Sequence, residues 1–174
     1  NAYQASGQID KALESYKTAV EREPDNKLFR FNYGTLLTQI EDYPAAVAQL
    51  EKAIELDPDY SNAYYNLGAA YINMAVDVND QVRSLDEALS AERGDLSRDQ
   101  ISEREATINA LVDERREIFD SAIAPLETAK SLFESAGEDA TGVCMALYQS
   151  YVQTNELDKA QSVEECAGYS DTGD

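Results

Sequence analysis

The hydrophobic and polar positions of the chain recur with a period of 34 residues. The block AVEREP at residues 19–24 has a counterpart in AIELDP at residues 53–58, and both run Ala, apolar, Glu, any residue, acidic, Pro. The same spacing separates FNYG at residues 31–34 from YNLG at residues 65–68. A fixed internal period of this length indicates structural repeats, each of which is a pair of helices. The sequence therefore predicts an all-α fold.

Small residues within the period predict how the two helices of a repeat pack. Gly34 and Gly68 carry no side chain where the second helix must approach closely, and the second helix has a small residue, Ala46, at the facing position. Pro24 and Pro58 then stop the second helix, because proline lacks a backbone donor and moves the preceding residue out of the helical region.

This pattern resembles the tetratricopeptide repeat, a helix–turn–helix unit of 34 residues. The resemblance implies an α-solenoid, which is a right-handed superhelix of antiparallel helix pairs. It covers about residues 1–77 and 118–168, and the interruption between them falls inside the third repeat. We therefore expect a tetratricopeptide array that carries an inserted helical hairpin.

The predicted division of the chain has four parts. Residues 1–77 hold a truncated first repeat that begins at Asn1, the second repeat, and the first helix of the third. The inserted hairpin occupies 78–117, and residues 118–168 hold the second helix of repeat three together with repeat four. Residues 169–174 form a polar tail that we expect to be frayed.

A coiled-coil-like pattern runs out of repeat three into the insertion. Apolar residues alternate spacings of four and three, which is typical of a coiled-coil seam: Tyr71, Ala75, Val78, Val82, Leu85 and Leu89. This helix is expected to end near Glu92, and Ser97 with Gln100 predicts a capping box for the returning helix. The returning helix continues the seam at Ile101, Arg104, Ile108, Leu111, Arg115, Ile118 and Ala122.

The pattern leaves three interpretations of this hairpin open. It can be a thickened wall that packs back on its own repeat. It can be a protruding arm for partner binding or dimerisation. It can also be a disordered insertion.

Composition and charge exclude several classes of function. The chain has 34 acidic and 14 basic residues, a formal charge of -20, and no His or Trp. Such a chain cannot neutralise a row of phosphates, so we expect no nucleic-acid binding. Without His, most zinc sites and all His-based catalytic triads are excluded, and no phosphate-binding glycine motif occurs. We predict no catalytic residue, no metal and no cofactor, and hence no enzyme.

The same charge shapes the expected partner and environment. Long-range attraction favours a neutral or basic partner, and the scarcity of Lys beside so many acids suggests a halophilic host. No apolar run approaches the roughly 18 residues that a membrane span needs, so no membrane insertion is expected. We expect a soluble chain of unknown compartment, with a cytoplasmic location favoured over a periplasmic or cell-envelope one.

Two cysteines, Cys144 and Cys166, fall on the facing helices of repeat four. A disulfide between them would staple that repeat and imply an oxidising compartment. Two buried thiols are the favoured alternative.

In the tetratricopeptide family the first helices line a concave groove that commonly holds extended peptides or partner helices. Asparagine offers a donor and an acceptor to a peptide backbone, and aromatic rings offer flat apolar contact. Alternatively, the asparagines are consensus residues without a binding role. The resemblance implies a groove lined in repeats two and three by Leu28, Phe31, Asn32, Thr35, Gln39, Asn62, Tyr65, Asn66 and Asn73.

Chaperone-binding members of the family resemble one another in a carboxylate clamp that uses Lys, Asn and Arg. At the clamp's cationic positions this chain has Asn62 and Asn66, or, one repeat further on, Gly142 and Ala146. Capture of a C-terminal acidic tail is therefore disfavoured.

Together these features predict a non-catalytic protein–protein interaction scaffold that binds a peptide or protein segment in the groove. The alternative is a structural self-assembly module that dimerises through residues 78–117.

Overall fold

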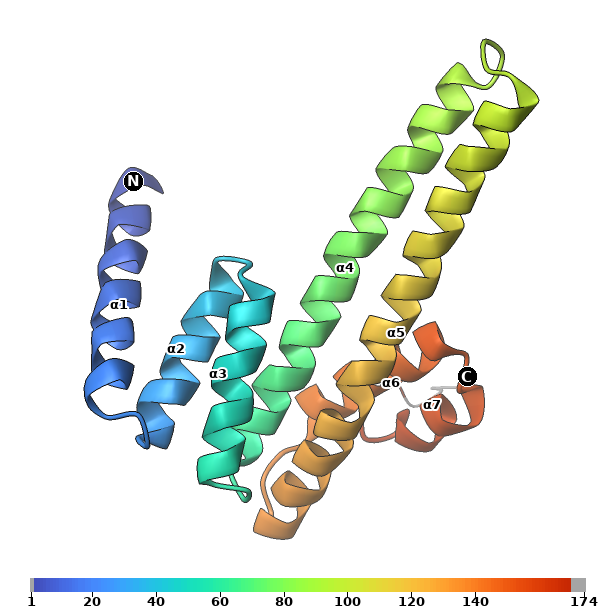
Figure 1. Cartoon of the computed structure of the whole chain (residues 1–174). Helices are drawn as coiled ribbons and strands as arrows, with labels where there is room; N and C mark the ends of the chain where they lie inside the picture. The colour runs from blue at the N-terminus through green and yellow to red at the C-terminus, as the bar shows by residue number, and fades with distance from the viewer. Residues whose placement is uncertain (1, 170–174) are drawn as a thin grey trace.

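A computed structural model describes residues 2–169, with side chains from Gln8 onward, and every element assigned in that range is a helix (Figure 1). Asn1 and residues 170–174 lie outside the described residues, and with them most of the predicted tail. The two helices that precede Pro24 and Pro58 end two residues before each proline, as predicted. The helices are α1 (Ala2–Arg22), α2 (Lys27–Gln39), α3 (Tyr43–Leu56), α4 (Ser61–Glu92), α5 (Arg98–Ala136), α6 (Thr141–Thr154) and α7 (Leu157–Val163).

Successive helices pack as antiparallel pairs, and two glycines set how closely they approach. A Cβ atom at Gly34 would lie 2.8 Å from Cγ of Leu50 and 3.1 Å from the carbonyl oxygen of Ala46. A Cβ atom at Gly68 would lie 2.4 Å from Cγ of Leu126. No side chain fits at these distances, which confirms the predicted role of both glycines.

Two clusters of buried residues form the interior from α3 to α7, and the partly buried Tyr71 packs against both. A small cluster of Leu50, Leu67 and Ala70 joins α3 to α4. A larger cluster joins α4, α5, α6 and the C-terminal end, where the alanines Ala122, Ala129 and Ala160 are all buried. Each pair therefore buries its apolar face against the next pair, which is how an α-solenoid is stabilised.

The longest helices, α4 and α5, lie side by side and extend well beyond the other helices (Figure 1). The capping box begins α5 as predicted: the Ser97 hydroxyl accepts from the Gln100 amide, and the Gln100 side chain accepts from the Ser97 amide. Leu89 is buried near the tip, whereas Leu85 is 40% exposed although the seam predicts it inside. Two helices alone cannot enclose every seam residue. The limits 78 and 117 of an insertion stay a prediction.

Polar contacts replace apolar ones at the two predicted arginine positions of the seam. Arg104 forms an ion pair with Glu92 at 2.8 Å. Arg115 donates to the Asn79 side-chain oxygen at 2.5 Å, and its Nε atom is buried without a hydrogen-bond partner. Burial of an unpaired donor is unfavourable, so Arg115 is a weak point of this pair.

The last pair departs from the repeat pattern. Cys144, fully buried in α6, is bonded to Cys166, three residues beyond the end of α7, with 5.7 Å between their Cα atoms. The favoured prediction of two free thiols was therefore wrong, because the chain that follows α7 folds back onto α6. Asn155 ends α6 in the left-handed conformation, at φ 66°, in the predicted turn.

None of the helices within residues 2–169 combines the length and the apolar character that crossing a membrane requires.

Candidate functional site

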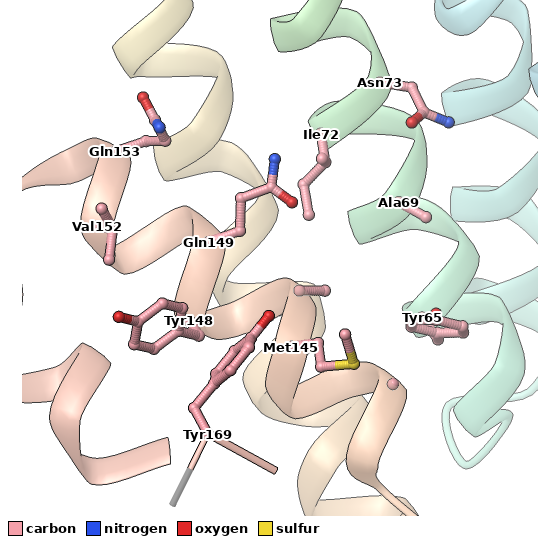
Figure 2. Close-up of a pocket in the computed structure, with 12 residues that line it drawn as sticks. Tyr65, Ala69, Ile72, Asn73, Met145, Tyr148, Gln149, Val152, Gln153 and Tyr169 are labelled. Carbon is pink, nitrogen blue, oxygen red and sulfur yellow. The ribbon is translucent and has the colours of Figure 1, made fainter. Parts of the chain in front are cut away.

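A cleft of about 550 Å³ opens between α4 and α6, the first helices of the third and fourth pairs (Figure 2). One wall is formed by the α4 residues Tyr65, Ala69, Ile72 and Asn73. The other wall is formed by Tyr169 and the α6 residues Gly142, Met145, Ala146, Tyr148, Gln149, Val152 and Gln153.

Aromatic rings bound this cleft on both sides. The Tyr148 and Tyr169 rings pack against each other with centroids 4.9 Å apart and an interplanar angle of 47°. Figure 2 shows Met145 between this pair and Tyr65 on α4. A Cβ atom at Gly142 would lie 3.3 Å from the Tyr65 hydroxyl oxygen, so the absence of a side chain at Gly142 lets α6 and Tyr65 approach closely at this end of the cleft.

Amide side chains occupy the other part of the cleft. Asn73, Gln149 and Gln153 are exposed, and each offers both donors and an acceptor. Gln149 points toward Ile72 across the cleft (Figure 2). The site thus combines an apolar, aromatic part with a polar and uncharged rim, which is a composition suited to holding a ligand by shape and hydrogen bonds.

The most strongly perturbed titratable group lies behind α6 rather than in the cleft. The buried Tyr151 hydroxyl donates to Glu127 at 2.6 Å, and the Lys159 ammonium lies 5.4 Å from the ring centroid. Burial, and then the hydrogen bond to Glu127, raise the pKa of Tyr151. These contacts join α5, α6 and α7, so Tyr151 holds the last pair together.

Within residues 2–169 there is no group of three or more His, Cys, Asp or Glu residues that could hold a metal ion.

The predicted groove residues fall into two groups in the structure. Residues of the first group line the cleft or are at least partly exposed. Tyr65 and Asn73 line the cleft, and Leu28, at 52% exposure, is open to solvent on α2. Gln39 and Asn62 are also exposed, while Asn32 is half-buried.

The second group forms contacts between helices instead. Asn66 donates to the Thr35 hydroxyl oxygen at 2.8 Å, which joins α4 to α2. The Phe31 ring packs on Tyr60 with centroids 4.9 Å apart. These three predicted residues therefore have a structural role.

The α6 residues of the cleft are absent from the predicted groove, although the repeat register marks them. A residue with positive φ follows each of α2 and α6: Glu41 at 64°, two residues after α2, and Asn155 at 66°, directly after α6. When the two helices are aligned on these residues, the predicted positions of α2 fall on cleft residues of α6: Leu28, Phe31, Asn32, Thr35 and Gln39 correspond to Gly142, Met145, Ala146, Gln149 and Gln153.

Comparison with known families matches two parts of the chain to tetratricopeptide models. A model described as "TPR repeat" matches residues 34–74, and one described as "Tetratricopeptide repeat" matches residues 1–26.

Curated relatives match over less than half of this chain. The Hsp70-Hsp90 organizing protein of Triticum aestivum is 32% identical over 74 residues, which is 42% of this chain and 13% of that protein. The TPR repeat-containing protein YpiA of Bacillus subtilis is 36% identical over 67 residues, which is 38% of this chain and 16% of that protein. This chain thus spans a small part of the length of these relatives.

Solved structures share the fold over most of the chain. A structure described as MamA MSR-1 C2 superposes with a TM-score of 0.61 at 21% identity, and covers 97% of this chain and 70% of that one. The TPR2B domain of yeast Sti1, in complex with pHsp70, superposes with a TM-score of 0.57 at 18% identity, and covers 87% of this chain and 90% of that one. These similarities show an all-α tetratricopeptide solenoid.

Proposed function

Because the chain is a tetratricopeptide repeat protein, we propose that it is a non-catalytic scaffold that binds a peptide or protein segment on the face formed by α2, α4 and α6. Tetratricopeptide proteins are generally protein-interaction scaffolds, and the yeast Sti1 domain of the same fold is in complex with pHsp70. The observation that carries the proposal is the cleft between α4 and α6: Tyr65 and Asn73 are predicted groove residues, and five of its α6 residues correspond to predicted groove positions of α2.

The chemistry of the site favours binding over catalysis. Its lining residues supply apolar surface, amides and the hydroxyls of Tyr65, Tyr148 and Tyr169, and none of them is Asp, Glu, Lys, Arg, His or Cys. General acid–base catalysis most often uses His, Glu, Asp or Lys. A peptide needs what this cleft offers, namely hydrogen-bonding amides for its backbone and apolar surface for its side chains.

A neutral or basic partner is favoured by charge. The formal charge of -20 attracts a basic partner over long range and repels an acidic one. Repulsion of acidic segments also agrees with the absence of cations at Asn62, Asn66, Gly142 and Ala146, where chaperone-binding members carry a clamp.

The test is a comparison of proteins captured from a lysate of the source organism by three immobilised forms of the chain. The face variant carries Leu28→Ala, Asn73→Ala and Gln149→Ala, all at exposed positions. The control carries Leu157→Ala and Gln161→Ala, at exposed positions of α7. We expect the wild type and the control to recover the same partner and the face variant to recover much less. Equal recovery by all three forms would refute binding on this face.

A second candidate function is self-association through the distal part of α4 and α5. This part projects beyond the other helices (Figure 1), and Leu85, at 40% exposure, lies on it. If the chain dimerises there, light scattering should give twice the chain mass for the wild type and the mass of one chain for Leu85→Lys. The mass of one chain for both proteins would reject this candidate.

A further inference from the structure

The cleft between α4 and α6 is uncharged in a chain that is rich in charge. Charged residues make up 28% of the sequence, yet none of the lining residues is Asp, Glu, Lys or Arg. A charged side chain that entered the cleft would lose hydration without gaining a counter-ion, which is unfavourable. The cleft therefore selects against charged ligand groups.

Two apolar side chains on the α6 wall of the cleft face solvent. Met145 is 44% exposed and Val152 is 39% exposed, although residues of this kind are normally buried. They lie two helical turns apart, so both are presented along one side of α6. Tyr65 and Ile72 face them from α4. Covering this surface with an apolar group would remove it from water.

Negative charge flanks the Gly142 end of the cleft. Glu138 and Asp139 are exposed and come directly before α6, where the Asp139 carboxylate accepts from the Thr141 amide at 2.9 Å. An acidic residue beside a bound apolar group would be repelled there, whereas a neutral or basic neighbour would not.

We propose that this cleft binds one bulky apolar side chain, such as Leu, Met or Phe, of an extended peptide segment that carries no acidic residue beside it. The inference rests on the proposed function and narrows it to one subsite and one class of ligand. The exposed amides of Asn73, Gln149 and Gln153 bind the peptide backbone on either side of the inserted residue. Gly142 lets the Tyr65 hydroxyl approach α6 closely at one end of the cleft, so a side chain at Gly142 would crowd that end.

The two methionines of the chain provide a direct readout. Met145 lines the cleft, whereas Met74 is half-buried and does not line it. Methionine methyl groups labelled with ¹³C therefore give one signal in the site and one internal reference. The probes are blocked pentapeptides, acetyl-Gly-Ala-X-Ala-Gly-amide, with X as Leu, Phe, Lys or Glu. The protein is the full chain.

We expect the Leu and Phe probes to shift the Met145 signal saturably while the Met74 signal stays in place. The Lys and Glu probes should bind at least tenfold more weakly. Gly142→Leu, which places a side chain against Tyr65, should weaken the Leu probe at least tenfold. The matched control is Gly94→Leu at the tip of the long pair, where a Cβ atom meets nothing within 4 Å, and it should bind as the wild type does.

Three results would overturn the inference. They are no shift of Met145, equal shifts with all four probes, or an unaltered response in Gly142→Leu. A Met145 signal that moves with protein concentration alone would show that a second copy fills the cleft, and would overturn it too. If lysate capture depends on the face formed by α2, α4 and α6 but the Leu probe does not shift the Met145 signal, only this inference is refuted. If capture is equal for all forms, the proposed function falls.

Discussion

Reduction of the Cys144–Cys166 disulfide should loosen the last helix pair and leave the rest of the array intact. The bond closes a loop with a sequence separation of 22 residues, which contains all of α7. Loop closure of this size lowers the entropy of the unfolded segment, and for n of 22 the chain-entropy relation gives about 3.4 kcal/mol at 25 °C. Helix α7 has 7 residues, too few to be stable alone, so this segment should open first.

Amide hydrogen exchange followed by mass spectrometry measures this effect locally. A loss of about 3.4 kcal/mol corresponds to a fall in protection of roughly 300-fold. We expect that fall in residues 157–167 after treatment with dithiothreitol, and no change in α2 and α3. The double variant Cys144→Ala, Cys166→Ala should behave as the reduced protein does and should not respond to dithiothreitol.

Two outcomes would contradict this prediction. Unaltered exchange in residues 157–167 would mean that packing of Ala160, Val163 and Ala167 alone holds the segment. An equal loss of protection in α2 and α3 would mean that the array unfolds as one unit, and the disulfide would then contribute to global stability instead.

Three further predictions concern packing and charge. Gly68→Ala places a Cβ atom 2.4 Å from Cγ of the buried Leu126, so urea unfolding followed by circular dichroism should show a loss of about 1–3 kcal/mol despite the better helix propensity of alanine; a gain would contradict the close approach. Arg115→Met removes the buried unpaired Nε atom, and we expect the same assay to show equal or higher stability; a loss above about 1 kcal/mol would mean that the bond to Asn79 outweighs that cost. Stability should rise between low and molar KCl, because salt screens the self-repulsion of a chain at -20, and unchanged stability would reject the halophilic hypothesis.

The repeat pattern predicted much of the fold because the residues that define it act on the backbone near them. Gly34 and Gly68 mark close helix approaches, prolines mark helix ends, and Ser97 with Gln100 marks the start of α5. Each of these residues affects the backbone within a few positions or the packing of one neighbouring helix. Its role can therefore be recognised in a single sequence.

The cleft was predicted only in part, because its α6 wall depends on contacts between segments far apart in sequence. Tyr65 and Asn73 follow from the pattern of repeats two and three, whereas Met145 lies in repeat four, outside the predicted groove. The pairing of Cys144 with Cys166 depends on how the chain beyond α7 folds back, which periodicity does not encode. Phe31 and Asn66 were predicted to face the groove, but both make contacts within the array. Phe31 packs on Tyr60, and Asn66 donates a hydrogen bond to Thr35. The repeat pattern does not reveal such contacts with a neighbouring helix.

The departures of the last repeat from the pattern are also what complete the cleft. When α2 and α6 are aligned on the turn residues Glu41 and Asn155, Tyr148 of α6 occupies the position of Gly34 in α2. A large residue there keeps the following segment at a distance, and the Tyr148 ring instead packs on Tyr169. That packing forms one side of the cleft, and the disulfide joins Cys166, three residues before Tyr169, to Cys144 on α6. Stability of the terminal pair and ligand binding should therefore be coupled, so reduction should weaken the Leu probe as well as the protection of α7. A probe affinity that is indifferent to reduction would show that Tyr169 stays on Tyr148 without the disulfide.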